Sequence, residues 1–128
     1  MIQAGAAGLA AMAVVAGSPG TAQASDYGYI HAHVPGSLDD GPVVGTLRFV
    51  SDGDRIRVCD SRRDGRAVHA YVFRPQAGMP VTSVSARGGY GTCAETDAND
   101  YNLRDGSTYE FRGRRTNDPL ELVFYDQA

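Results

Sequence analysis

Apolar and polar side chains alternate with a period of two through most of this 128-residue chain after residue 24. Such alternation is typical of strands that bury one face, and the spacing of an amphipathic helix is hard to find anywhere in it. The alternating stretches are residues 27–34, 45–50, 54–60, 67–73, 81–86, 107–112 and 120–126. The pattern therefore predicts seven strands and restricts the chain to all-β architectures.

Asp-Gly pairs punctuate these stretches at residues 40–41, 52–53, 64–65 and 105–106. The pair is typical of tight turns, because Gly reaches the positive φ that such turns need. Short strands with turn signals at this spacing predict an antiparallel β-sandwich, immunoglobulin-like in outline, or a small barrel. An immunoglobulin domain proper would carry a core Trp, and the chain has none. We therefore expect one sandwich-like domain over residues 25–128.

Residues 1–24 differ from the rest, with no charged side chain, an apolar run over residues 6–16 and then Ala22-Gln23-Ala24. An apolar run followed by an A-x-A tripeptide is typical of a secretory signal peptide, and this run is too short for a membrane-spanning helix. No basic residue precedes the run, which suggests that translation starts upstream of Met1. We expect a secreted, extracellular protein that begins near Ser25.

The chain has two cysteines, Cys59 and Cys93. In an exported domain two cysteines are expected to form a disulfide, and neither has the CxxC or Cys-His neighbours of a metal site. We predict a Cys59–Cys93 disulfide, worth about 3.5–4 kcal/mol in the chain-entropy picture.

Charge is densest in residues 51–73, SDGDRIRVCDSRRDGRAVHAYVF. Arg55 and Arg57 share one strand face, and the aspartates lie in or beside turns, where they can accept backbone N–H bonds or pair with arginines. We interpret the stretch as the solvated side of a β-hairpin, because its arginines and aspartates nearly balance. The formal net charge of −3 also argues against a nucleic-acid or anionic-membrane partner.

The segment GDRIRVCDSRRDGRAVHAYV, residues 53–72, resembles a pattern of small secreted actinobacterial proteins. In that pattern Gly-Asp, an alternating strand, Asp, a few polar residues, Asp-Gly and a second alternating strand follow one another. The resemblance extends loosely to the signal segment and to LRDGSTYEFR. It implies a secreted β-sandwich of no assigned activity, and it carries over no catalytic residue.

Residues 86–106, ARGGYGTCAETDANDYNLRDG, are long for a connection and nearly lack aliphatic side chains. Tyr, Gly and Asn are typical of binding loops, and Cys93 would hold the middle of this one in place. The loop is therefore a candidate contact surface, with two tyrosines exposed and close together, and the open alternative is a merely solvated connection. The predicted contact residues are Tyr90, Tyr101, Arg87 and Asn102.

His31 and His33 lie two residues apart, and His69 is the only other histidine. Two imidazoles on one strand face can supply two ligands to Zn²⁺ or Cu²⁺, with a third from a neighbouring strand. The alternative is an amphipathic surface row that also contains Tyr27 and Tyr29. A weaker calcium site is also open, formed by Asp97, Asn99 and Asp100.

Sequence motifs of catalysis are missing: the chain has no GxSxG, no HExxH and no phosphate-binding glycine loop. We therefore expect a monomeric, non-catalytic binding module without a cofactor, whose partner is an extracellular protein or glycan. Two alternatives stay open. One is a small metal-binding protein that uses the three histidines, and the other is a secreted protease or glycosidase inhibitor that uses residues 86–106.

Overall fold

The computed structural model of the chain describes residues 25–37, 41–119 and 122–128, so the expected signal segment lies outside the described residues. Within these ranges the chain forms eight strands and no helix, and hence no apolar helix that could cross a membrane. The strands are β1 (Ser25–His31), β2 (Val43–Val50), β3 (Arg55–Asp60), β4 (Val68–Phe73), β5 (Thr82–Ala86), β6 (Cys93–Thr96), β7 (Thr108–Arg115) and β8 (Leu122–Gln127).

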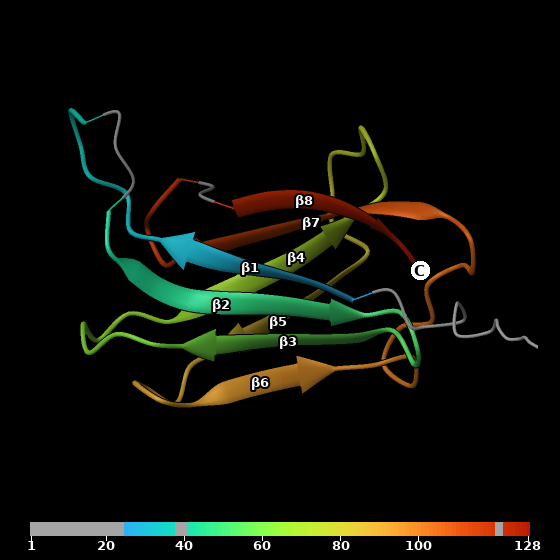
Figure 1. Ribbon diagram of the computed structural model, residues 1–128, viewed down its shortest axis with the longest axis horizontal. Helices are drawn as coiled ribbons and strands as arrows, with labels where there is room; N and C mark the ends of the chain where they lie inside the picture. The colour runs from blue at the N-terminus through green and yellow to red at the C-terminus, as the bar shows by residue number, and fades with distance from the viewer. Residues whose placement is uncertain (1–24, 38–40, 120–121) are drawn as a thin grey trace, which may run out of the picture.

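The strands form two four-stranded sheets that lie one in front of the other in Figure 1. Sheet A has the order β1-β2-β3-β6, and sheet B has the order β5-β4-β7-β8. Every pair of neighbouring strands is antiparallel. The all-β sandwich predicted from the alternation is confirmed, and the described strands do not close into a barrel.

The hydrophobic core lies between the two sheets and consists of the apolar positions of the alternating pattern. Phe49 of sheet A meets Phe111 of sheet B with ring centroids 4.4 Å apart, and Phe124 stacks on Phe111 at 5.2 Å. Leu47 and Val58 are fully buried beside them. Because successive side chains of a strand point to opposite faces, the residues between these positions lie on the outer faces of the sheets.

Residues 51–73 do not form the hairpin that we expected, because β3 and β4 belong to different sheets. Strand β2 occupies one edge of β3 and β6 occupies the other, so both rows of backbone groups of β3 are already paired. Strand β4 pairs with β5 and β7 instead. The Asp64-Gly65 turn therefore carries the chain from one sheet to the other, and the hairpin of this region is β2–β3.

Residues 86–106 are not one loop, because β6 divides them into a turn at residues 87–92 and a connection that starts at Asp97. The β6 sequence CAET gives a weak alternation signal, since Ala94 is the one aliphatic side chain that it turns inward. Its pairing with β3, and not its own composition, makes it a strand.

An ion-pair network holds the connections at one end of the sandwich. Arg115 binds Asp118 with a nitrogen–oxygen distance of 2.9 Å and Asp64 at 3.1 Å, and Arg66 reaches Asp118 at 3.1 Å. Burial alone would raise the pKa of Asp118, but hydrogen bonds from Arg115 and from the His33 N–H hold that pKa below its usual value. The network ties the β3–β4 connection to the end of β7.

Candidate functional site

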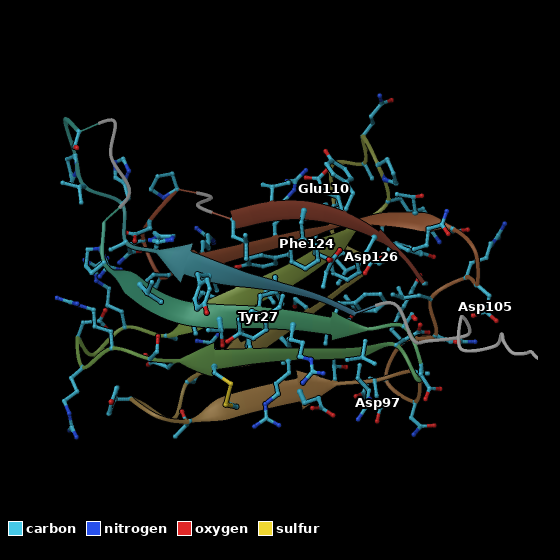
Figure 2. The ribbon with its side chains drawn as sticks, in the orientation of Figure 1. Tyr27, Asp97, Asp105, Glu110, Phe124 and Asp126 are labelled. Atoms are coloured by element: carbon cyan, nitrogen blue, oxygen red, sulfur yellow. A yellow bond between two sulfur atoms is a disulfide. The ribbon has the colours of Figure 1, made fainter. Side chains whose placement is uncertain are left out.

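The outer face of sheet A carries three arginines and two tyrosines, which we call the arginine–tyrosine face: Tyr27, Tyr29, Arg48, Arg55 and Arg57. Strand pairing places Tyr27 opposite Arg48 and Arg48 opposite Arg57, so the three side chains form a row across β1, β2 and β3. This face is turned toward the viewer in Figure 2, where Tyr27 is labelled.

The two tyrosines of this face are exposed large rings. Tyr27 is 55% exposed and Tyr29 is 54% exposed. Their ring centroids lie 5.4 Å apart in an edge-to-face arrangement, which holds each ring against the other. The pair therefore presents ordered aromatic surface at the β1 edge of the sheet.

Among the three arginines of this face, Arg57 alone has an ion-pair partner in the described residues. Arg57 lies 3.8 Å from Glu95, and both side chains are well exposed, so the pair contributes little. Arg48 and Arg55 form no ion pair with any residue in the described ranges. The three arginines surround a shallow hollow of about 110 Å³ together with Val50 and Glu95. The face therefore has a positive net charge and guanidinium groups that are available to a ligand.

Two of the four aspartates of residues 51–73, Asp54 and Asp60, do not neutralise these arginines, because they are turned into the molecule. Asp54 is 3% exposed and accepts the Leu103 N–H at 2.9 Å, and burial raises its pKa although that hydrogen bond lowers it. Asp60 is also 3% exposed and accepts the Arg62 N–H at 3.1 Å. The sequence of this stretch has nearly equal numbers of arginines and aspartates, but these two aspartates do not balance the arginines on the surface.

On the outer face of sheet B, in contrast, the charged side chains bind other side chains of the same sheet. The Arg112 guanidinium lies 3.9 Å from the ring centroid of Phe73 and forms an ion pair with Glu110. The Tyr125 hydroxyl donates to the same carboxylate at 3.3 Å. Figure 2 labels Glu110 on this rear sheet.

His69 and Arg114 continue the same pattern on sheet B. The two ring nitrogens of His69 lie 2.7 Å from the hydroxyl oxygens of Ser85 and Thr116, and burial, followed by the charges of Arg87 and Arg114, lowers the pKa of His69. Arg114 donates to the Tyr71 hydroxyl at 3.2 Å. These hydrogen bonds connect neighbouring strands of sheet B and occupy the polar groups of His69.

The predicted three-histidine metal site is not formed. His31 lies on sheet A and its Nδ1 is 2.9 Å from the Gly41 carbonyl, whereas His69 lies on the outer face of sheet B. His33 follows β1 and is exposed. Over the described ranges no group of three His, Cys, Asp or Glu side chains could hold a metal ion. This alternative fails because His69 sits on a strand that pairs in the other sheet.

The predicted calcium residues also have local structural roles. The Asp97 carboxylate accepts the Asn99 N–H at 2.9 Å, and the Asp100 carboxylate accepts the Thr96 hydroxyl at 2.8 Å. These hydrogen bonds shape the turn that follows β6, as Asx side chains commonly do.

Tyr90 and Tyr101 lie at opposite ends of the sandwich and not on one surface. Tyr90 is 53% exposed, and its turn is tied to the end of β3 by a Gly91 N–H bond to the Asp60 carbonyl. Tyr101 follows β6 at the other end and is partly buried against the core. The strand that we missed separates the two tyrosines. Arg87 accompanies Tyr90, and the exposed Asn102 accompanies Tyr101.

The predicted disulfide is formed. Cys59 and Cys93 are directly opposite each other on β3 and β6, with their Cα atoms 4.0 Å apart. The bond, yellow in Figure 2, lies on the outer face of sheet A and does not connect the two sheets. It fastens the short edge strand β6, which carries Glu95, to β3, which carries Arg57.

A pair of carboxyl groups lies at the seam between β1 and β8. Burial, followed by the charge and hydrogen bonding of Asp126, raises the pKa of Asp26. One buried oxygen of Asp126 has no hydrogen-bond partner within the described residues.

Comparisons with protein family models, with curated proteins and with solved structures gave no match for this chain. No enzyme family and no relative of known activity was therefore found.

Proposed function

We propose that this protein is an extracellular, non-catalytic binding module that uses the arginine–tyrosine face to hold an anionic ligand. One observation carries the proposal. Arg48 and Arg55 have no ion-pair partner in the described part of the chain, and Arg48 lies directly opposite Tyr27, one of two tyrosines that are more than half exposed.

The chemistry of these side chains suits an anion with an extended body. A guanidinium group donates several N–H bonds in a planar fork that matches a carboxylate, sulfate or phosphate group. Tyrosine supplies amphipathic contact area at a low cost in conformational entropy. Because both kinds of side chain stand on paired strands, the backbone needs little further ordering when the ligand binds.

Two further features support the extracellular, non-catalytic assignment. The Cys59–Cys93 disulfide is typical of proteins outside the cytosol, and residues 1–24 have the composition of a signal peptide. Among the described residues, the carboxylate that lines the hollow of this face is Glu95, and that group is already near Arg57. Such a face offers hydrogen-bond donors and rings, and not a paired acid and base.

The proposal is tested with the double variant R48Q/R55Q. Its matched control is R74Q/R104Q, which removes the same charge from exposed arginines outside the face. Titration calorimetry with oligogalacturonate, heparin oligosaccharide and polyglutamate should find at least one probe that binds wild type more weakly as salt rises. R48Q/R55Q should weaken that binding by about tenfold or more, and R74Q/R104Q should not. If no probe binds, or if both variants lose affinity equally, the proposal is wrong.

A further inference from the structure

A second group of arginines lies where β3 ends and β6 begins. The Arg63 guanidinium lies 4.6 Å from the ring centroid of Tyr90. Beside it is a hollow of about 230 Å³, which we call the end hollow. Its lining residues are Asp60, Gly65, Arg66, Ala67, Arg87, Gly88 and Gly89.

Two arginines, Arg66 and Arg87, line the end hollow, and Arg63 lies next to it over the Tyr90 ring. Arg63 and Arg87 form no ion pair with the residues that the structure describes, and both are exposed. Arg66 shares the Asp118 carboxylate with Arg115 and is 39% exposed. Asp60 is the one acidic lining residue, and its buried carboxylate is occupied by the Arg62 N–H.

Backbone donors add to this hollow. Gly89 and Gly91 have φ values of +99° and +83°, so the turn before β6 is built on conformations that favour glycine. In the described part of the chain, the N–H groups of Gly88 and Gly89 donate no hydrogen bond to a backbone carbonyl. Small residues and unused N–H groups allow an anionic oxygen to approach the main chain closely.

The end hollow lies past the end of β3, at the end of the sandwich, whereas the arginine–tyrosine face lies on the outer side of the same strand. Arg55 and Arg57 point outward from β3, Cys59 follows on the same face, and the Tyr90 turn is bonded to Asp60 at the end of β3. Five residue steps of an extended strand separate Arg55 from Asp60, which is about 17 Å. A ligand that contacts both areas must therefore be extended and must carry more than one negative charge.

We infer that the ligand is a linear acidic polysaccharide that runs from the arginine–tyrosine face along β3 to the end hollow. The inference rests on the proposed function and specifies its ligand. A chain of acidic sugars offers repeated carboxylates to the arginines and ring faces to Tyr27, Tyr29 and Tyr90. An acidic peptide offers charges without such regular rings, so a sugar chain fits the combination of arginines and tyrosines better.

The test measures how affinity depends on the length of the ligand. Oligogalacturonates from the disaccharide to the octasaccharide are titrated into wild type, R63Q/R87Q and R74Q/R104Q at fixed salt. A ligand that reaches both areas gains affinity because the second contact forms within one complex. Wild type and R74Q/R104Q should bind the octasaccharide at least tenfold more tightly than the disaccharide. R63Q/R87Q should bind the two within about threefold of each other.

Each result separates the inference from the proposed function. If wild type binds short and long oligomers equally, the inference is overturned and the proposed function stands. If R63Q/R87Q keeps the full gain with length, the end hollow is not the second contact and the inference is again overturned. Tighter binding of polyglutamate or of a single-stranded oligonucleotide overturns the choice of a polysaccharide, and the absence of any binding overturns the proposed function itself.

Discussion

The outer faces of the two sheets hold the same kinds of side chain and use them in opposite ways. On sheet B, Arg112 lies on the Phe73 ring and binds Glu110, two residues earlier on the same strand. On sheet A, the neighbour of Arg55 two residues along the strand is a second arginine, Arg57. Whether an arginine supports its own sheet or has no ion-pair partner among the described residues therefore depends on which side chains lie beside it.

The difference extends to how each face is held together. Sheet B is tied by side-chain hydrogen bonds that cross its strands, such as those of Glu110 and His69. Sheet A has few such bonds on its outer face and has one covalent tie instead, between Cys59 and Cys93. The arginines of its outer face therefore contribute little to holding sheet A together.

Removal of the covalent tie should have the largest effect. The double variant C59A/C93A should lose about 3–4 kcal/mol of unfolding free energy, because the bond closes a loop between residues 34 positions apart. Urea unfolding of wild type and variant measures the loss. A loss below about 1 kcal/mol would mean that the unfolded chain gains little freedom when the bond is absent, and that side-chain contacts hold sheet A after all.

A matched pair of glutamate variants compares the two faces directly. E110Q should lose about 2 kcal/mol, because it leaves the mostly buried Arg112 without its counterion. E95Q should change stability by about 0.5 kcal/mol or less, because the Arg57–Glu95 pair is loose and exposed. Both are measured by urea unfolding at neutral pH. Equal losses would contradict the view that ion pairs stabilise the outer face of sheet B and not that of sheet A.

The smallest effect concerns pH and His69. Because burial and nearby arginines hold its folded pKa below the ordinary 6.5, the unfolded chain binds more protons as the pH falls below that value. Stability should therefore fall as the pH is lowered from 7 to 5, and H69Q should show a flatter dependence.

The wild-type minus H69Q difference isolates this contribution from that of the carboxyls. The raised pKa values of Asp26 and Asp54 act in the opposite direction, since those groups favour the folded state when protonated. Parallel curves for wild type and H69Q would show that the His69 pKa is not lowered.

The sequence predicted the strands well because alternation is a local property. Residues such as Leu47 and Phe49 show which face is buried, whatever sheet the strand joins. Pairing is not local, and so β3 and β4 were wrongly joined in one hairpin. The short β6 was missed because Ala94 alone carried its alternation. Because β6 was missed, we predicted that Tyr90 and Tyr101 lie close together on one loop, although β6 separates them.

The candidate site was harder to predict for a related reason. A count of charges in residues 51–73 cannot show that Asp54 and Asp60 are buried. A usable signal was nevertheless present, because Asp in or beside a turn commonly accepts backbone N–H bonds and is then unavailable to arginine. The pattern Arg-x-Arg at residues 55–57, with no acidic residue on the same face of that strand, was the sequence signal for the arginine–tyrosine face.

Charged side chains are also unevenly distributed between the two ends of the sandwich. Arg62, Arg63, Arg66 and Arg87 gather at the end where β3 finishes, and Asp97 and Asp105 lie at the opposite end in Figure 2. A chain whose overall charge is negative can therefore still turn one end toward a negatively charged surface. Its orientation during a diffusional encounter would be set before any contact forms, and the β3 end would arrive first.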